Sequence, residues 1–272
     1  MGVAQLPAYQ LYNAKGKPVS FQTVLAEMGK ADVFFFGELH NNPIAHWLTY
    51  ELIKQHGKKH FQKLVIGMEM LETHQQAALN DYLSGKTDIE TWEAEKLWSN
   101  YATDYKPIIE YAKLNQIPVI ATNIPRQYAR IVNKAGLDSL AALPEAEKQL
   151  FMKLPLEVPT TQSYENMKTM FHDGKDSEKQ NRFVAAQAVK DATMAERILA
   201  NRKEGQLFFH LNGSYHSDEK EGIIWYLQKA NPKLKIVNLT TIEMETVQKP
   251  DASVCKKADF ILVVPESMTK TY

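Results

Sequence analysis

Two segments of the sequence share a design in which histidine follows an apolar run at the same spacing. Val33–His40 reads VFFFGELH and Leu207–His216 reads LFFHLNGSYH, so each has an apolar run, then Gly, two further residues and His. Glycine lets the chain bend sharply after a strand. In Gly-Glu-Leu-His, Glu38 and His40 are two residues apart, a spacing that suits acid–base catalysis or metal ligation.

Two further apolar runs end in polar residues that extend this set. LVIGMEM places Glu69 after one run, and VIATNIPR places Thr122, Asn123 and Arg126 after the other. Taken singly, each of these residues is explained as well by capping a helix or lying in solvent as by a role in a functional site. Together with His216, they have a shared role only in a fold that gathers them.

The apolar runs themselves predict buried strands. Their near-continuous hydrophobicity is typical of a parallel sheet that is covered on both faces. The predicted core strands are Val33–Phe36, Leu64–Met68, Pro118–Ala121, Leu207–Leu211, Ile236–Leu239 and Phe260–Val264. Helical patterns such as Ile44–His56 lie between them, and Tyr9–Phe21 predicts an edge hairpin. The sequence therefore predicts an α/β fold with a mostly parallel central sheet flanked by helices. Since ligands bind outside the carboxyl ends of parallel strands, we expect the His and Glu residues above to line one cavity.

A long stretch separates the third and fourth core strands. Residues 125–205 have helical character, are far longer than an ordinary crossover connection, and predict a helical insertion within a single domain of residues 1–272. Ser177–Ala200 lacks Gly and Pro and predicts one long helix. The prolines and threonines of Leu154–Thr161 predict a linker or lid, and Tyr164–Phe171 predicts a short helix after it.

Composition excludes several protein classes. Hydrophobic residues make up 44% and charged residues 24%, which is typical of a soluble globular protein. Lys plus Arg and Asp plus Glu both total 32, so we expect no nucleic-acid partner. Cys255 is the only cysteine, which excludes an intramolecular disulfide. The start MGVAQLPAYQ does not resemble a signal peptide, although a Met-Gly start also fits a chain whose export signal has been removed.

Five motifs occur together between Asp32 and Leu239: GELHNNPIAH, GMEM, YKPIIEYAKLNQIPVIATNIPR, QAVKDATMAERI and HLNGSYH. In this order they resemble the ChaN-like haem-binding family. The resemblance implies a bacterial protein of haem or iron uptake, which in its full-length form is a periplasmic or outer-membrane-anchored lipoprotein. It also implies haem as the ligand, a homodimer in which two haems face each other, and an outer-membrane haem receptor as a partner.

The resemblance further implies ferric haem b held by a tyrosinate, a hard anionic ligand that favours ferric iron. The candidate ligands are Tyr164, Tyr105 and Tyr101. The other residues expected at the haem are His40, His216, Asn123 and Arg126. An apolar wall is expected from Met167, Met170 and Phe171, whereas Met194, a further candidate, is better explained as ordinary core. The cations expected opposite the propionates are Lys168, Lys175, Arg126 and Arg130.

The Gly-x-x-His pair also resembles a wider superfamily that includes Tiki metalloproteases and erythromycin esterases. On this alternative the chain is a metal-dependent hydrolase. Its divalent metal, such as Zn or Mn, would be held by His40, His216 and either Glu38 or Glu69, with the remaining Glu as general base. Ser214 lacks the nucleophile-elbow pattern of serine hydrolases. A third alternative is a haem-free protein that docks on an outer-membrane receptor through its helical insertion.

Overall fold

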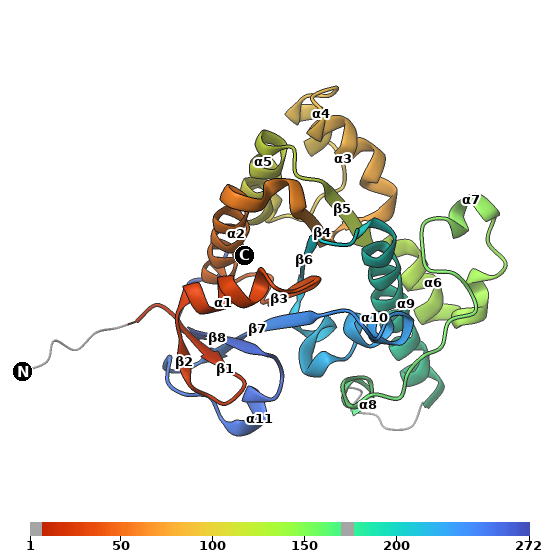
Figure 1. Cartoon of the computed structure of the whole chain (residues 1–272). Helices are drawn as coiled ribbons and strands as arrows, with labels where there is room; N and C mark the ends of the chain where they lie inside the picture. The colour runs from red at the N-terminus through yellow and green to blue at the C-terminus, as the bar shows by residue number, and fades with distance from the viewer. Residues whose placement is uncertain (1–6, 170–176) are drawn as a thin grey trace, which may run out of the picture.

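The computed structural model describes residues 7–169 and 177–272, which form a sheet with helices on both faces (Figure 1). The strands are β1 (Gln10–Asn13), β2 (Pro18–Val19), β3 (Val33–Glu38), β4 (Leu64–Glu72), β5 (Val119–Asn123), β6 (Leu207–Gly213), β7 (Ile236–Met244) and β8 (Phe260–Pro265). Their order across the sheet is β2-β1-β8-β7-β3-β6-β4-β5. β1 is antiparallel to β2 and β8, and the pairs from β8 to β5 are all parallel.

The helices lie mostly between successive strands. The longer ones are α1 (Phe21–Met28), α2 (Pro43–His60), α3 (Gln76–Leu83), α5 (Lys106–Asn115), α6 (Arg126–Ala135), α8 (Gln162–Thr169), α9 (Ser177–Asn201) and α10 (Ile223–Ala230). The shorter ones are η1 (Phe61–Lys63), η2 (Thr73–Gln75), α4 (Ile89–Glu93), the π-helix η3 (Tyr101–Tyr105), η4 (Leu137–Leu140), α7 (Glu145–Lys148), η5 (Ser214–His216), η6 (Asp218–Lys220) and α11 (Ala252–Cys255). Within the described ranges, no helix is both long enough and apolar enough to cross a membrane.

The predicted α/β fold, its mostly parallel sheet and its edge hairpin are confirmed. Each core strand, however, continues past the end of its apolar run. β3 reaches Glu38 because Gly37 and Glu38 still pair with Asn212 and Gly213 of β6. Glu38 therefore belongs to the hydrogen-bonded ladder, whereas His40 and His216 lie just beyond the strands and Glu69 lies where the pairing of β4 with β5 shifts register.

Alternate side chains of the strands enter two separate apolar cores. Phe34 and Phe36 of β3 pack on one side of the sheet with residues of α2, α3 and α5. Val33 and Phe35 pack on the other side with residues of α9 and α10. Successive residues of a strand point to opposite faces. Because both faces are covered, both sets are apolar, and this explains the unbroken hydrophobic runs.

The chain leaves the neighbouring strands β3 and β6 in opposite directions. α2 leads from β3 past β6 to β4, and α10 leads from β6 past β3 to β7. In an open parallel sheet, such a reversal leaves a crevice outside the carboxyl ends of the two strands. The GELH and GSYH segments follow these two strands, so the topology places both at the crevice.

The stretch between β5 and β6 is helical, as predicted, and its described residues contain no strand. The predicted long helix is present as α9, but it packs on the sheet and on α10 rather than standing apart. α9 is thus the crossover helix between β5 and β6. The added part runs from α6 to α8, and its residues Tyr128 and Phe151 form an apolar cluster with Val189 of α9.

Candidate functional site

The end of β3 and the turn after it bring a carboxylate and an imidazole into contact. Glu38 is 1% exposed, and its Oε1 lies 2.9 Å from Nδ1 of His40. The hydroxyl of Tyr105, from the π-helix η3, donates to the same oxygen at 2.6 Å. Gly37 has no room for a side chain, since a Cβ there would lie 3.0 Å from Cα of Ser214. The Glu–His pair expected from the spacing is therefore formed and is closed on one side by a tyrosine.

A second histidine continues this cluster behind Glu38. Nε2 of His46, in the first turn of α2, lies 3.5 Å from Oε2 of Glu38, and its Nδ1 lies 3.3 Å from Oδ2 of Asp104. The amide of Asn100 donates to Asp104 at 2.6 Å and to the carbonyl of His40 at 2.9 Å. Sequence reasoning missed His46 and Asp104. The place of His46 at the end of GELHNNPIAH was the available signal, whereas nothing local marked Asp104.

The ends of β4 and β6 form a matching arrangement around His216. Nε2 of His216 lies 3.1 Å from Oε1 of Glu69, and its Nδ1 contacts Oδ1 of Asp191. Asp191, from α9, is fully buried and accepts a hydrogen bond from the hydroxyl of Tyr164 at 2.6 Å. The amide of Gly213 donates to Oε2 of Glu69 at 2.7 Å. His216 is therefore held between two carboxylates, one of which, Asp191, sequence reasoning did not select.

The two arrangements meet at Gly213. A Cβ on this residue would lie 2.6 Å from Nε2 of His40 and 3.6 Å from Oε2 of Glu69. Only glycine leaves space for the His40 ring against the backbone of β6. The His and Glu residues expected at the strand ends are thus gathered in one cluster at the carboxyl ends of β3, β4 and β6.

Carboxylates favour the charged form of both His40 and His216. Burial acts to lower the pKa of His216, but the charges of Glu69 and Asp191 and their hydrogen bonds outweigh it and raise this pKa to about 10. Burial also acts against the charge on His40, yet Glu38 and Glu69 raise its pKa. Burial likewise acts to raise the pKa of Glu38 and Glu69, and their histidine partners lower it instead. At neutral pH His216 is therefore an imidazolium between Glu69 and Asp191, and the neighbouring carboxylates favour the charged form of His40.

This pairing differs from the metal site considered in the hydrolase alternative. A histidine ligand must be a neutral imidazole, whereas both ring nitrogens of His216 face carboxylates. Across residues 7–169 and 177–272, no three His, Cys, Asp or Glu side chains are arranged to hold a metal ion. The metal-ligand set of His40, His216, Glu38 and Glu69 stays a prediction.

The three tyrosines considered as haem ligands are buried. Tyr101 is 5% exposed, and Tyr105 and Tyr164 are each 1% exposed. The hydroxyls of Tyr105 and Tyr164 donate hydrogen bonds to Glu38 and Asp191. Burial raises the pKa of all three phenols, which opposes phenolate formation. In this structure Tyr105 and Tyr164 support the His–carboxylate cluster, and Tyr101 belongs to the apolar core.

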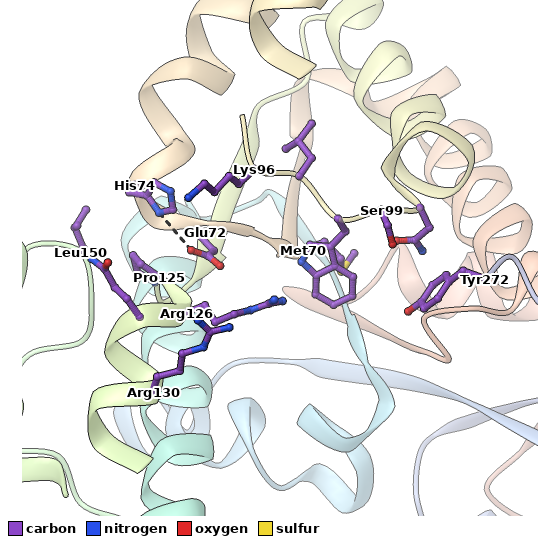
Figure 2. A pocket seen from close by; sticks show the side chains of 14 residues that line it. Met70, Glu72, His74, Lys96, Ser99, Pro125, Arg126, Arg130, Leu150 and Tyr272 are labelled. Carbon is purple, nitrogen blue, oxygen red and sulfur yellow. Dashed lines mark ion pairs between the residues drawn. The ribbon is translucent and has the colours of Figure 1, made fainter. Parts of the chain in front are cut away.

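A cleft opens beside the cluster and reaches the carboxyl ends of β4 and β5 (Figure 2). Its volume is about 780 Å³. The Trp98 ring, in the cleft wall, lies 4.8 Å from the His40 ring between centroids, so the cleft adjoins the cluster. Figure 2 shows Arg126 and Arg130 pointing from α6 into the cleft, with Tyr272 on the opposite side.

The remaining residues singled out in the sequence lie in several places. Arg126 and Arg130 line the cleft, and Asn123 is half-buried at the end of β5. Met167 and Met194 lie in apolar clusters, and Lys168 pairs with Glu165 at 2.7 Å. Met170, Phe171 and Lys175 lie outside the described residues. The apolar part of the cleft wall comes instead from Met70, Leu97 and Trp98.

Two tyrosines that sequence reasoning did not select are exposed at this edge of the sheet. Tyr215 is 62% exposed, although its neighbours Ser214 and His216 are buried. Tyr272 lines the cleft and is also 62% exposed. The place of Tyr215 inside GSYH was a usable signal. Tyr272 carries no local signal, because only the fold brings it to the cleft.

Comparisons with known proteins agree with this architecture. The family model described as "Haem-binding uptake, Tiki superfamily, ChaN" matches residues 24–227. The chain belongs to this haem-binding family. Its membership confirms the resemblance carried by the sequence motifs. The structure of ChaN of Campylobacter jejuni, described as binding haem cofacially, is 19% identical and superposes with a TM-score of 0.72, over 94% of this chain and 96% of that one.

Other structures share the fold of this ChaN-family chain. A succinoglycan biosynthesis protein is 11% identical, with a TM-score of 0.55 and 90% of each chain covered. The erythromycin esterase mutant EreC H289N is 12% identical, with a TM-score of 0.50, over 87% of this chain and 77% of that one. No curated protein matches this chain in sequence. At these identities the likeness concerns the fold alone, so it does not decide whether this family member is an enzyme.

Proposed function

We propose that this chain binds haem in the cleft beside His40 and acts in bacterial haem or iron uptake. The observation that carries the proposal is the position of the cleft, which adjoins the His–carboxylate cluster through Trp98. Its volume of about 780 Å³ is within the range of cofactor sites. Trp98 and Met70 offer an aromatic and a polarisable surface to a flat macrocycle. Membership of the haem-binding family supports the same ligand.

The proposed source of the iron ligand is an exposed tyrosine at this edge, Tyr215 or Tyr272. Both can approach a bound macrocycle without breaking a buried hydrogen bond, unlike Tyr105 and Tyr164. A tyrosinate ligand favours ferric iron, so the proposed cofactor is ferric haem b. The bound group would supply the iron centre, and the chain would supply its ligand and an enclosing wall.

Titration with ferric haem tests the proposal. We expect a shifted Soret band and a tyrosinate charge-transfer band, and no spectral change at excess haem would contradict the proposal. Tyr215→Phe and Tyr272→Phe separate the two candidate ligands, because only loss of the true ligand removes the charge-transfer band. Tyr164→Phe tests the buried candidate, and Tyr9→Phe, at the edge hairpin, is the matched control.

Hydrolysis by the same cluster is a second candidate function. The observation that favours it is His40, whose side chain is 30% exposed while its partner Glu38 is fully buried. A histidine oriented by a carboxylate is a typical general acid–base. Ester and peptide turnover, together with metal analysis, test this candidate. Activity that is lost in His40→Ala and Glu38→Gln would support it, and absence of turnover in the wild type would contradict it.

We also propose that the full-length protein is a periplasmic or outer-membrane lipoprotein that forms a homodimer and meets an outer-membrane haem receptor. Its support is the motif resemblance. Fractionation of cells that express the full-length gene tests the location. Light scattering with and without haem tests the dimer, and co-purification tests the receptor. A monomer at all haem concentrations would contradict the dimer.

A further inference from the structure

One wall of the cleft carries positive charge that the described residues do not neutralise. Lys96, Arg126 and Arg130 line this wall, and no described carboxylate forms an ion pair with any of them. Glu72, the acidic side chain among the lining residues, pairs with His74 at 3.5 Å. The formal net charge of the whole chain is +0, so the excess is local to the cleft. We call Lys96, Arg126 and Arg130 the cationic wall.

The geometry of α6 directs this charge into the cleft. Arg126 and Arg130 are four residues apart and therefore share one side of the helix. The opposite side is anchored, because Tyr128, Ala129 and Val132 are buried. α6 also begins at Arg126, so the positive end of its dipole lies at the same wall. Figure 2 shows both guanidinium groups extending toward the side that holds Tyr272.

We propose that the cationic wall recognises the two carboxylates of a tetrapyrrole, so that the cleft selects its ligand by the acidic edge of the ring and not by the iron. The inference rests on the proposed function, since it takes the cleft as the haem site. Guanidinium groups bind carboxylates through two parallel hydrogen bonds, which gives both energy and orientation. The apolar side of the cleft, with Trp98 and Met70, is left for the face of the ring.

Three probes separate recognition of carboxylates from recognition of iron: haemin, protoporphyrin IX and the dimethyl ester of protoporphyrin IX. Quenching of the intrinsic tryptophan fluorescence reports binding of each. We expect protoporphyrin IX to bind within about tenfold of haemin, and its ester to bind at least about tenfold more weakly. Binding of the acids should weaken as salt is added, because exposed charges are screened.

Variants of the cationic wall locate the effect. Arg126→Ala and Arg130→Ala should each weaken the binding of haemin and of protoporphyrin IX by a similar factor, about threefold to tenfold, since both arginines are exposed. Arg182→Ala, which removes an arginine paired with Glu178 on α9, should leave both affinities unchanged. Binding of the ester should be insensitive to all three substitutions.

The outcomes distinguish this inference from the proposed function. If haemin binds and protoporphyrin IX does not, the inference is overturned and haem binding stands. Equal binding of the ester and the acid also overturns it. If protoporphyrin IX binds through the arginines and haemin does not, haem as the ligand is overturned while recognition of the carboxylates stands. Failure of all three probes overturns both.

Discussion

Replacing Asp191 with Asn tests whether buried carboxylates hold His216 in its charged form. Asp191 is fully buried and accepts hydrogen bonds from Nδ1 of His216 and from the hydroxyl of Tyr164. Asparagine preserves the shape of the side chain but removes its charge. Loss of one partner from a buried ion pair costs about 3–5 kcal/mol. We expect a loss of that order in the free energy of unfolding of Asp191→Asn near neutral pH.

The dependence on pH has a definite sign. The pKa of His216 is about 10 in the folded chain, against an ordinary value of 6.5. Between these values the folded state binds more protons than the unfolded state, so stability falls as pH rises. The contribution is fully present below pH 6.5 and is lost as pH rises through about 10. A shift of this size corresponds to at most about 5 kcal/mol, shared among His216, Glu69 and Asp191.

Urea unfolding followed by circular dichroism, at several pH values from about 6 to 9, measures this effect. In Asp191→Asn the pKa of His216 should fall, so the loss of stability at alkaline pH becomes smaller and is complete at a lower pH. Asp251→Asn, at an exposed aspartate, is the matched control and should behave as the wild type. The reasoning is refuted if Asp191→Asn costs less than about 1 kcal/mol and keeps the wild-type dependence on pH.

Three other substitutions give separate tests. Glu38→Gln removes the charge beside His40 and should lower the pKa of that histidine, which NMR titration measures. The same substitution should cost about 1–3 kcal/mol of stability. An unchanged pKa of His40 would contradict the pairing with Glu38. Gly213→Ala places a methyl group 2.6 Å from Nε2 of His40 and should displace this ring, so a crystal structure with the ring unmoved would count against the close contact. Trp98→Ala should weaken haem binding about tenfold, whereas Trp225→Ala, on α10, should not; equal affinities in both variants would exclude Trp98 from the haem site.

The core strands could be predicted because the relevant signals are local, although each strand ends later than its apolar run. An unbroken apolar run such as Val33–Phe36 predicts a strand covered on both faces, and the packing of Phe34 and Phe35 into opposite cores confirms it. The start of α2 also has a local signal, because asparagine is a favoured residue at the N-terminus of a helix. In the structure the Asn42 side chain accepts hydrogen bonds from the amides of Ile44 and Ala45, each at 3.1 Å. The convergence of Glu38 and Glu69 followed from a general rule on parallel sheets.

The role of α9 in the core could not be predicted from local sequence signals. The helix itself was predicted, but its helical pattern is the same whether it stands in an insertion or crosses over the sheet. Only its packing against Val33, Phe35 and Phe208 identifies it as part of the core. That packing carries the buried Asp191 to the end of β6, which explains why this carboxylate was missed.

The sequence by itself determined the strands, the positions of Glu38, His40, Glu69 and His216 at strand ends, and the family, because these depend on residues close together in the chain. Only the tertiary structure decided the partner of each polar group. Tyr105 and Tyr164 meet carboxylates from β3 and α9, and the cleft is bordered by Tyr272 from a remote segment. Such pairings depend on how helices pack on the sheet, and this packing cannot be predicted from the spacing of residues along the chain.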